Sequence, residues 1–363
     1  GVGAGRARRL DPAALLADAP AEAASSEGPF DAAQPATLVF TSGSTSAPKA
    51  ALHTAGNHVF SARGSNANLP LGPGDRWLLS LPLYHVGGLA IGFRCFEAGA
   101  AVVLPLPGRS VGETITAYAV THGSLVPTQL RRLLDEDRAL PSLRGLLLGG
   151  AAAPAGLVEA AHARGLPVHT TYGSTEMASQ VTTTPPGADL AALRTSGRLR
   201  PHRELRIAAD GEILVRGATL FAGYVEGEGV RRPLDGAGWF HTGDLGRLDG
   251  EGFLHVLGRK DNLFVSGGEN VQPEEVERAL TGIDGVAQAV VVPVADAEWG
   301  ARPVAFVRPA KGAALEPARL RAALAEHLPR FKIPDAFYPW PEDDGRMKPD
   351  RAALQRRAAL HRG

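Results

Sequence analysis

Cysteine is almost missing from this 363-residue sequence, since Cys95 is the only one. A disulfide framework and a cysteine-ligated zinc site are therefore excluded, and the usage fits a reducing cytoplasm. An excess of charge is missing too, with 38 basic and 38 acidic residues, so the broad positive field typical of a nucleic-acid-binding protein is lacking. No apolar run is long enough to cross a bilayer and no signal segment is recognisable, which predicts a cytoplasmic protein without membrane partners.

Two common catalytic motifs are also missing. The Walker A pattern fails after Gly43, because Pro48 stands where that motif requires a second glycine. The nearest run to the Gly-x-Ser-x-Gly elbow of hydrolases, residues 43–46, fails at its last glycine. His85 stands beside two glycines, but no second histidine follows at helical or hairpin spacing to complete a metal site. Taken alone, His85 is interpreted as a structural residue.

The most informative segment present is Thr41–Lys49, a run rich in Thr, Ser and Gly that ends in a lysine. Such a loop exposes backbone N–H groups and hydroxyls with no bulky side chain in the way, so it can wrap an anion. Lys49 adds a mobile positive charge, which suits a polyphosphate better than a single carboxylate. The apolar residues 36–40 predict the strand that delivers the loop. The alternative interpretation of the run is a polar surface turn.

The spacing of apolar residues predicts a layered α/β protein. Residues 1–35 are expected to form an N-terminal extension or linker, because 17–35 are rich in Ala, Ser, Glu and Pro. The large domain is predicted over residues 36–258. In its first part, up to about residue 200, short apolar strands alternate with helical patterns. From about 200 to 258, short strands and glycine turns indicate a β-rich subdomain.

A polar break at residues 258–261 predicts a domain boundary. Beyond it, Pro273 is expected in the first turn of a helix that opens with Glu274 and Glu275, two charges that suit the helix dipole. Two strand-like runs and another helical pattern follow. Residues 259–363 are therefore predicted to form a small α+β domain.

A polar segment and two single residues elsewhere are candidates for binding a nucleotide. In the segment Tyr172–Glu176, the ring could stack on a purine and the carboxylate could hold Mg²⁺; the alternative is a plain strand-to-loop turn. Asp244, expected after a tight turn, could accept hydrogen bonds from both ribose hydroxyls, or be a turn or cap residue. Arg259 could add a ribose contact or form a surface salt bridge. Lys348 lies on a polar loop and alone indicates nothing.

In this order, these segments resemble the adenylate-forming superfamily of acyl-CoA synthetases, peptide-synthetase adenylation domains and luciferases. The resemblance covers residues 36 to 355. It implies a large N-terminal α/β domain and a small, mobile C-terminal domain, with ATP, Mg²⁺ and coenzyme A as cofactors and co-substrates. It also implies the reaction: a carboxylate attacks the α-phosphorus of ATP, giving an acyl-adenylate and pyrophosphate, and a thiol then displaces AMP.

The resemblance assigns a role to each matching position. The phosphate loop comprises Thr41, Ser42, Gly43, Ser44, Thr45 and Lys49. The adenine and magnesium segments comprise Gly149, Gly150, Ala151, Tyr172, Gly173, Ser174, Thr175 and Glu176. In these segments Thr175 is expected near the α-phosphate and Glu176 on the metal. The ribose pair is Asp244 and Arg259, and the hinge residue is Asp261. The loop that lines the thiol channel comprises Gly267, Gly268, Glu269 and Asn270. The catalytic lysine is Lys348.

A narrower resemblance is to the o-succinylbenzoate–CoA ligase family of menaquinone synthesis. It is carried by Leu81–Leu89 with Arg94 nine residues after His85, and by four other segments. It implies an aromatic carboxylic acid as substrate and a homodimer as one assembly. The expected acid-pocket residues are His85, also assigned a catalytic role, Gly87, Arg94, Gly149 and Gly150. We hypothesise that Arg94 binds the carboxylate that does not react.

Three departures from the superfamily pattern keep alternatives open. Ser46 and Ala50 replace usual glycines of the phosphate loop, and Met347 stands where glycine is common. Only 40 residues precede the loop, so the chain is either a naturally short form or lacks part of the large domain. The alternatives are another aryl or acyl acid–CoA ligase, an adenylation domain that loads a carrier protein, and a non-catalytic nucleotide-binding fragment.

Overall fold

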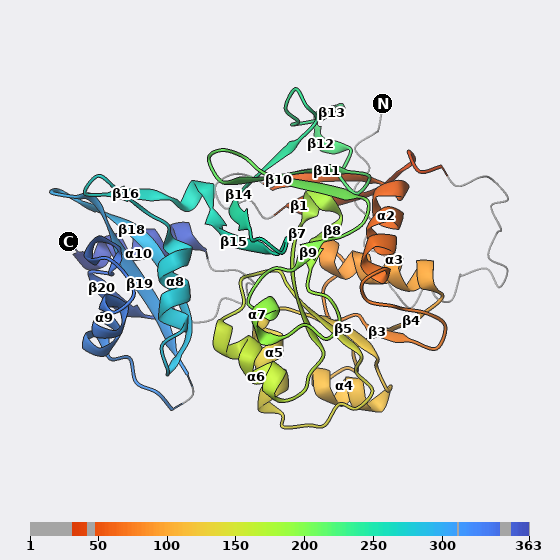
Figure 1. Ribbon diagram of the computed structural model, residues 1–363, viewed down its shortest axis with the longest axis horizontal. Coiled ribbons are helices and arrows are strands. Elements are labelled where there is room, and N and C mark those ends of the chain that lie inside the picture. Colours follow the sequence, from red (N-terminus) through yellow and green to blue (C-terminus); the bar gives the residue numbers. More distant parts are fainter. Residues whose placement is uncertain (1–30, 42–47, 311, 342–349, 363) are drawn as a thin grey trace. The chain divides into compact units, whose positions relative to one another are not determined.

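The computed structural model describes residues 31–41, 48–310, 312–341 and 350–362. The core of the first part is a seven-stranded sheet in the order β4-β3-β5-β6-β7-β8-β9. Strands β3 to β7 run parallel, β8 pairs antiparallel with β7, and β9 pairs antiparallel with β8 (Figure 1). The bounds of these strands are β3 Arg76–Leu78, β4 Ala101–Val103, β5 His122–Leu125, β6 Gly145–Leu148, β7 Val168–Ser174, β8 Ser179–Thr183 and β9 Arg198–Leu199.

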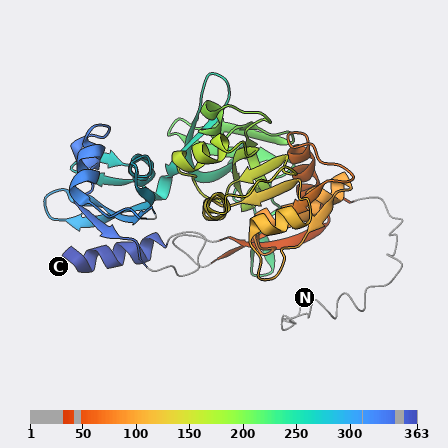
Figure 2. The ribbon, with the colours of Figure 1, turned by 90° about the horizontal axis from the view of Figure 1, so that it is seen from below.

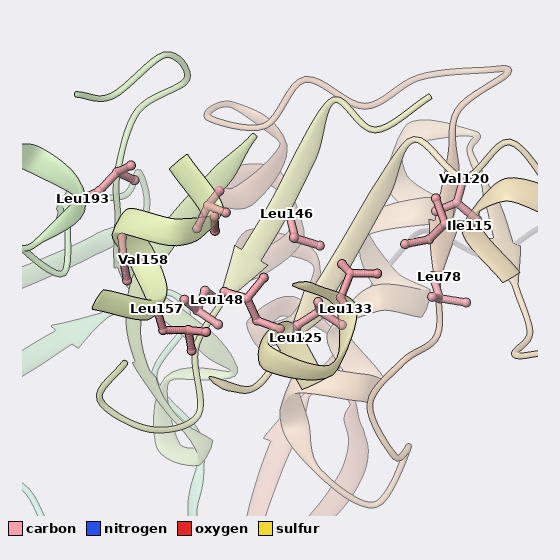
Figure 3. Packing of buried hydrophobic residues seen from close by; sticks show 13 residues of the cluster. Leu78, Ile115, Val120, Leu125, Leu133, Leu146, Leu148, Leu157, Val158 and Leu193 are labelled. Atoms are coloured by element: carbon pink, nitrogen blue, oxygen red, sulfur yellow. The ribbon is translucent and has the colours of Figure 1, made fainter. Parts of the chain in front are cut away.

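Helices cover both faces of this sheet, and alternating strand residues supply the two cores. Leu146 and Leu148 of β6 join a leucine-rich cluster with helices that follow the strands, whereas Leu147 between them joins Trp77 and Ile91 on the other side. Figure 3 shows the leucine-rich cluster gathered between strands and helices. The helices of this part are α2 Ala55–Asn66, α3 Val86–Ala98, α4 Val111–Ala117, α5 Pro127–Asp135, α6 Ala155–Ala163 and α7 Leu190–Leu193.

Two four-stranded antiparallel sheets stand beside the large one, in the orders β1-β2-β12-β13 and β10-β11-β14-β15. A shared core joins them, with Ala51 of β2, Met177, Val215, Phe221 and Leu254 among its members. Their bounds are β1 Pro35–Thr41, β2 Lys49–Thr54, β10 Arg203–Ile207, β11 Glu212–Gly217, β12 Gly223–Glu226, β13 Gly229–Arg231, β14 Phe240–Leu248 and β15 Leu254–Arg259.

Residues from Phe264 onward form a smaller α+β module. Its three-stranded sheet is sandwiched: alternate residues of β18 face α8 and α9 on one side and α10 on the other (Figure 2). A short β16–β17 hairpin completes the module. The bounds are β16 Phe264–Ser266, β17 Glu269–Val271, α8 Pro273–Thr281, β18 Val286–Asp296, β19 Gly300–Pro309, α9 Pro317–Ala325, β20 Ala336–Pro339 and α10 Arg351–Arg362.

The predicted α/β class, the β-rich segment and the C-terminal α+β module are confirmed. Pro273 stands in the first turn of α8, with Glu274 and Glu275 in the same turn, as predicted. The predicted boundary at 258–261 spans the end of β15 and the start of the short 3-10 helix η2, Lys260–Asn262. The boundary and its role as a hinge both stay predictions. Within the described residues, no helix is both long and apolar enough for a membrane span.

Candidate functional site

Thr41 and Lys49 lie opposite each other at the open ends of β1 and β2. The predicted phosphate loop therefore connects two antiparallel strands, and its first and last residues are held in register. Lys49 is exposed, and its Nζ lies 5.3 Å from the centre of the Tyr224 ring. Ser42, Gly43, Ser44 and Thr45, which the sequence assigns to the loop, lie outside the described residues, as does Lys348.

The Tyr172–Glu176 motif lies at the end of the last parallel strand. Tyr172, Gly173 and Ser174 belong to β7, and a short 3-10 helix, η1 Thr175–Met177, carries the next residues. Strand β8 returns beside β7, and a Cβ on Gly173 would overlap the Ser179 carbonyl oxygen. Glycine is therefore required at this position for the two strands to approach.

Tyr172, Asp244 and Arg259 converge on one carboxylate. The Tyr172 hydroxyl donates to Oδ2 of Asp244 over 2.7 Å, and Nη1 of Arg259 lies 3.1 Å from Oδ1. Burial, together with the Asp244 charge, raises the pKa of the Tyr172 phenol well above its ordinary value, so it remains a donor. Burial lowers the pKa of Arg259, but the charges and hydrogen bonds of Asp244 and Asp261 together outweigh burial, so the net pKa is raised.

The position of Asp244 differs from the sequence prediction. It lies within strand β14 rather than after a tight turn, directly opposite Arg259 of β15 in the strand register. Gly243 has a φ of +70°, and the register shifts just after Leu245, so the strand is irregular here. The sequence pattern around Gly243 predicted a tight turn, and the structure has this strand irregularity in its place. Arg259 does form salt bridges, with Asp244 and with Asp261, so its alternative interpretation is also partly correct.

Glu176 is held by a tyrosine that the sequence did not single out. The Tyr224 hydroxyl donates to Oε1 of Glu176 over 2.7 Å, and Lys49 lies over the same ring. Burial, followed by the nearby Glu176 charge, raises the pKa of Tyr224, which keeps this donor protonated. The contact joins residues 48 positions apart in the chain, so no spacing rule indicates it.

Two further contacts fix the backbone around Glu176. The Nε2 atom of buried His53 lies 2.7 Å from the Thr175 carbonyl oxygen. A carbonyl only accepts, and burial lowers the pKa of His53, so the neutral ring donates its Nε2–H. The Phe221 N–H donates to the Glu176 carbonyl over 2.8 Å. His53 and Phe221 were also missed by sequence reasoning.

The predicted acid-pocket residues lie around helix α3. His85 is the N-cap residue of α3, half-buried, with its ring 4.6 Å from that of Tyr84. Gly87 is in the first turn. Arg94 is only 2% exposed, and its Nη2 donates to Ser179 Oγ over 3.0 Å and to Gln180 Oε1 over 3.2 Å. Arg94 thus reaches β8 beside the Tyr172–Glu176 motif.

The remaining predicted positions lie in two places. Gly149, Gly150 and Ala151 follow β6, and a Cβ on Gly149 would lie 2.8 Å from the Thr171 side chain, one residue before Tyr172. Gly267 and Gly268, with φ of +60° and +84°, form the turn of the β16–β17 hairpin, and Glu269 and Asn270 follow in β17. The roles assigned to these residues toward the acid and the thiol stay predictions.

The donor set around Glu176 suits a metal ion that arrives with phosphates. No cluster of three or more His, Cys, Asp or Glu side chains that could hold a metal occurs in the described part of the chain. Mg²⁺ usually keeps several waters and binds through one or two carboxylates plus substrate phosphate oxygens. Glu176, whose second oxygen is not used by Tyr224, fits one such carboxylate ligand.

Comparison with protein families identifies the family to which this chain belongs. Residues 5–225 match the AMP-binding enzyme family, and residues 275–344 match the AMP-binding enzyme C-terminal domain. This chain belongs to the AMP-binding enzyme family. In this AMP-binding enzyme, the Tyr172–Glu176 motif lies within the first match, whereas Asp244 and Arg259 lie between the two matched segments.

Individual relatives of this AMP-binding enzyme are known. It is 40% identical over 322 residues to the 2-succinylbenzoate–CoA ligase of Geobacillus kaustophilus, covering 85% of this chain and 66% of that protein. The chain thus spans just under two thirds of that relative's length. Two solved structures are of o-succinylbenzoate coenzyme A synthetase (MenE) from Bacillus subtilis. The complex with the acyl-adenylate intermediate OSB-AMP has a TM-score of 0.78 at 37% identity, covering 88% of this chain and 68% of that one. The complex with ATP and magnesium has a TM-score of 0.77 at 37% identity, covering 87% and 69%.

Proposed function

We propose that this AMP-binding enzyme ligates 2-succinylbenzoate to coenzyme A through an acyl-adenylate, with ATP and Mg²⁺, as a step of menaquinone synthesis. The observation that carries the proposal is the convergence of Tyr172 and Arg259 on Asp244, next to the Glu176–Tyr224 pair. A ring, a carboxylate for two ribose hydroxyls and a carboxylate for a metal are then brought near one another, because Tyr172 and Glu176 belong to one short segment of the chain. The relatives named above support the choice of acid.

In the first half-reaction, a carboxylate oxygen of the acid bonds to the α-phosphorus of ATP and the bond to pyrophosphate breaks. Two anions must be brought together, so positioning and charge stabilisation are the main tasks. We assign Asp244 to the ribose, the Tyr172 ring to adenine, and Lys49 with the 41–49 loop to the outer phosphates. Bound through Glu176, Mg²⁺ would neutralise phosphate charge.

In the second half-reaction, the thiolate sulfur of coenzyme A bonds to the acyl carbon and AMP leaves. We assign Gly267–Asn270 to the thiol channel and Asp261 to the hinge between the two states. Lys348 is assigned to the reacting carboxylate and α-phosphate. A homodimer and a cytoplasmic location, which the sequence also predicts, belong to this proposal.

Arg94 is assigned to the carboxylate of the substrate that does not react. Its guanidinium is buried and forms no ion pair among the described residues, so a substrate carboxylate would supply the missing opposite charge. Replacing Arg94 with Ala is expected to raise KM for the diacid, with KM for a monoacid analogue unchanged. Equal increases for both acids would contradict this assignment.

The deciding experiment incubates the purified 363-residue chain with ATP, Mg²⁺ and 2-succinylbenzoate and measures pyrophosphate release. Coenzyme A is then added, and the thioester is measured. Both products, with benzoate and succinate inert, are the expected result. Pyrophosphate with other acids only would favour another acid–CoA ligase. Acyl transfer to a carrier protein but not to coenzyme A would favour a carrier-loading domain. Nucleotide binding without pyrophosphate release would favour a non-catalytic fragment.

A further inference from the structure

The turn that follows Glu176 has an unusual backbone. Ala178 and Ser179 have φ of +51° and +109°, although neither is glycine. Side chains with a Cβ rarely adopt this region, because the Cβ approaches the backbone too closely. Such conformations persist where surrounding contacts over-determine them, and they cluster at functional sites. We call residues Thr175–Ser179 the 175–179 corner.

A buried serine holds the corner from helix α2. The Ser61 hydroxyl, 2% exposed, donates to the Ala178 carbonyl over 2.7 Å. His53, two residues before the start of the same helix, donates to the Thr175 carbonyl at the other end of the corner. One β2–α2 unit therefore fixes both ends of the corner that carries Thr175 and Glu176.

A buried arginine fixes Ser61 in turn. Nη2 of Arg203 donates to Ser61 Oγ over 3.0 Å and to Ser61 O over 3.3 Å, and Nη1 donates to the Pro201 carbonyl over 2.8 Å. Arg203 is 5% exposed, and a Cβ on Gly64 would overlap its Nη1. Because the Ser61 oxygen accepts from a charged donor, its own proton is directed to Ala178 and its donor strength rises.

A contribution to stability alone does not explain why Arg203 is buried. Neither Arg203 nor Arg94 forms an ion pair within the described ranges, and the Nε of each is buried without a partner there. A buried, unpaired charge is costly, and a buried arginine serving only stability normally has a carboxylate beside it. The contact with Ser61 is therefore the feature that the placement of Arg203 secures.

We propose that Arg203 is a positioning residue: through Ser61 it holds the strained 175–179 corner, and thereby the Thr175 and Glu176 groups that meet the nucleotide phosphates and Mg²⁺. Arg203 itself touches neither substrate nor metal. The catalytic consequence rests on the proposed function, whereas the hold on the corner does not.

The test is backbone hydrogen exchange of the full chain, followed in peptides that cover residues 174–183. Arg203→Met and Ser61→Ala are each expected to speed exchange in these peptides by about tenfold, the effect of losing one charge-assisted or buried hydrogen bond. Arg200→Met is the matched control. Arg200 is a neighbouring, half-buried arginine that bonds to Asn68 and to the Arg198 carbonyl instead, so it should leave exchange at the corner unchanged.

A rescue separates positioning from general stability. Glycine adopts the Ala178 conformation without strain, so the double variant Arg203→Met with Ala178→Gly should recover most of the lost protection. Binding of Mg²⁺ with a non-hydrolysable ATP analogue, measured by calorimetry, should weaken by about tenfold in Arg203→Met and recover in the double variant. Arg203→Lys, which keeps the charge and one donor, should lie between wild type and Arg203→Met.

Unchanged exchange at 174–183 in both Arg203→Met and Ser61→Ala would overturn the proposal. So would equal acceleration throughout the chain, or the absence of rescue by Ala178→Gly, because either result indicates a merely structural role. If Arg203→Met does not fold, Ser61→Ala and Arg203→Lys decide by the same criteria. If wild type releases no pyrophosphate, the proposed function fails, while the exchange data still decide whether Arg203 holds the corner.

Discussion

Two regions of the molecule differ in how their basic side chains are surrounded: in one they pair with carboxylates, and in the other they are buried without them. The paired-charge region lies at the start of β11, in β14 and at the end of β15, and comprises Asp210, Glu212, Asp244, Arg259 and Lys260. The buried-base region, between α2, α3 and β8, comprises His53, His58, Arg94 and Arg203. In the first region Lys260 lies 2.6 Å from Asp210 and 3.1 Å from Glu212. In the second, no carboxylate forms an ion pair with any base among the described residues.

The pKa directions follow the difference in surroundings. Hydrogen bonds and opposite charge lower the pKa of Asp210 and raise that of Lys260, so both charged forms are stabilised. Burial instead lowers the pKa of Arg94 to about 10, of Arg203 to about 9 and of His58 to about 3. Both arginines stay protonated at neutral pH, whereas His58 is neutral. Pairing thus stabilises the charges of the first region, whereas the two arginines of the second region are buried without a neutralising carboxylate among the described residues.

The largest expected effect on activity comes from removing a carboxylate from the paired-charge region, which leaves its bases unpaired like those of the buried-base region. Asp244→Asn removes the charge that Tyr172 and Arg259 share, and we expect about a 100-fold loss in kcat/KM for ATP, or about 3 kcal/mol. Pyrophosphate release at varied ATP concentration measures it. Asp210→Asn, an exposed carboxylate paired with Lys260, is the control and should change kcat/KM little. A loss of less than threefold in Asp244→Asn would contradict the ribose assignment.

The buried-base region should dominate sensitivity to mild acid. His58, bonded to Thr37 and stacked on Phe93, has a folded pKa of about 3 against 6.5 unfolded. The unfolded chain therefore binds the extra proton below pH 6.5, and stability falls as pH falls. We expect His58 to account for about 2 kcal/mol of lost unfolding free energy at pH 5.

Urea unfolding between pH 7 and pH 5 tests this expectation. His58→Gln should flatten the pH dependence by about one proton, whereas exposed His162→Gln on α6 should not. An unchanged slope in His58→Gln would show that this histidine is not the acid-sensitive group. The paired carboxylates lose their stabilising contribution only at lower pH. The pKa of Glu212 is lowered below 4.5, so its contribution to the free energy of unfolding is lost only as pH falls below that value.

A smaller effect is expected at Glu176, whose charge acts on His53 of the buried-base region and whose partner Tyr224 feels the charge of Arg259. Tyr224→Phe removes one hydrogen bond from its carboxylate, for which we expect about 1 kcal/mol, or roughly a fivefold loss in pyrophosphate release rate. The Mg²⁺ concentration for half-maximal rate should shift in the same variant. Tyr118→Phe, an exposed tyrosine, is the control. A normal Mg²⁺ dependence in Tyr224→Phe would separate this tyrosine from the metal.

The smallest effect should come from Lys260. Its pair with Asp210 is exposed on both sides, and such pairs contribute little because water and salt screen them. Its other partner, Glu212, is buried but keeps its contacts with the Gly243 N–H and His241 when the ammonium is removed. Lys260→Met is expected to shift Tm by less than about 2 °C, and the shift should disappear in 1 M NaCl. Arg231→Met, which breaks the exposed pair with Glu226, should behave alike. A larger, salt-resistant shift would show that the two regions differ less than the structure indicates.

Much of the fold could be predicted because it depends on local pattern. The apolar run in β18 and the proline and acids that open α8 are properties of neighbouring residues, and each led to the correct element. Asp244 shows the limit, because an irregular strand and a tight turn share the same Thr-Gly-Asp signature.

The supports of the site could not be predicted in this way. The contacts of Glu176 with Tyr224, Thr175 with His53, and Arg203 with Ser61 join residues 48, 122 and 142 positions apart. No periodicity connects such positions, and His, Ser and Arg are common for unrelated reasons. The resemblance to a family indicated which residues meet ligands, but not which residues hold them in place.

Trp77 gives the buried-base region a built-in optical reporter. Its indole is fully buried, bonds to Ser124 Oγ over 3.1 Å, and lies 5.2 Å from the Arg94 guanidinium. Emission from such a dry, cation-flanked indole differs in wavelength and intensity from that of Trp299, which is 47% exposed. A ligand that engages Arg94 alters the field at this ring. Under the proposed function, fluorescence of a Trp239→Phe variant, which lacks the other buried indole flanked by arginines, can therefore follow occupation of the acid pocket without any added label.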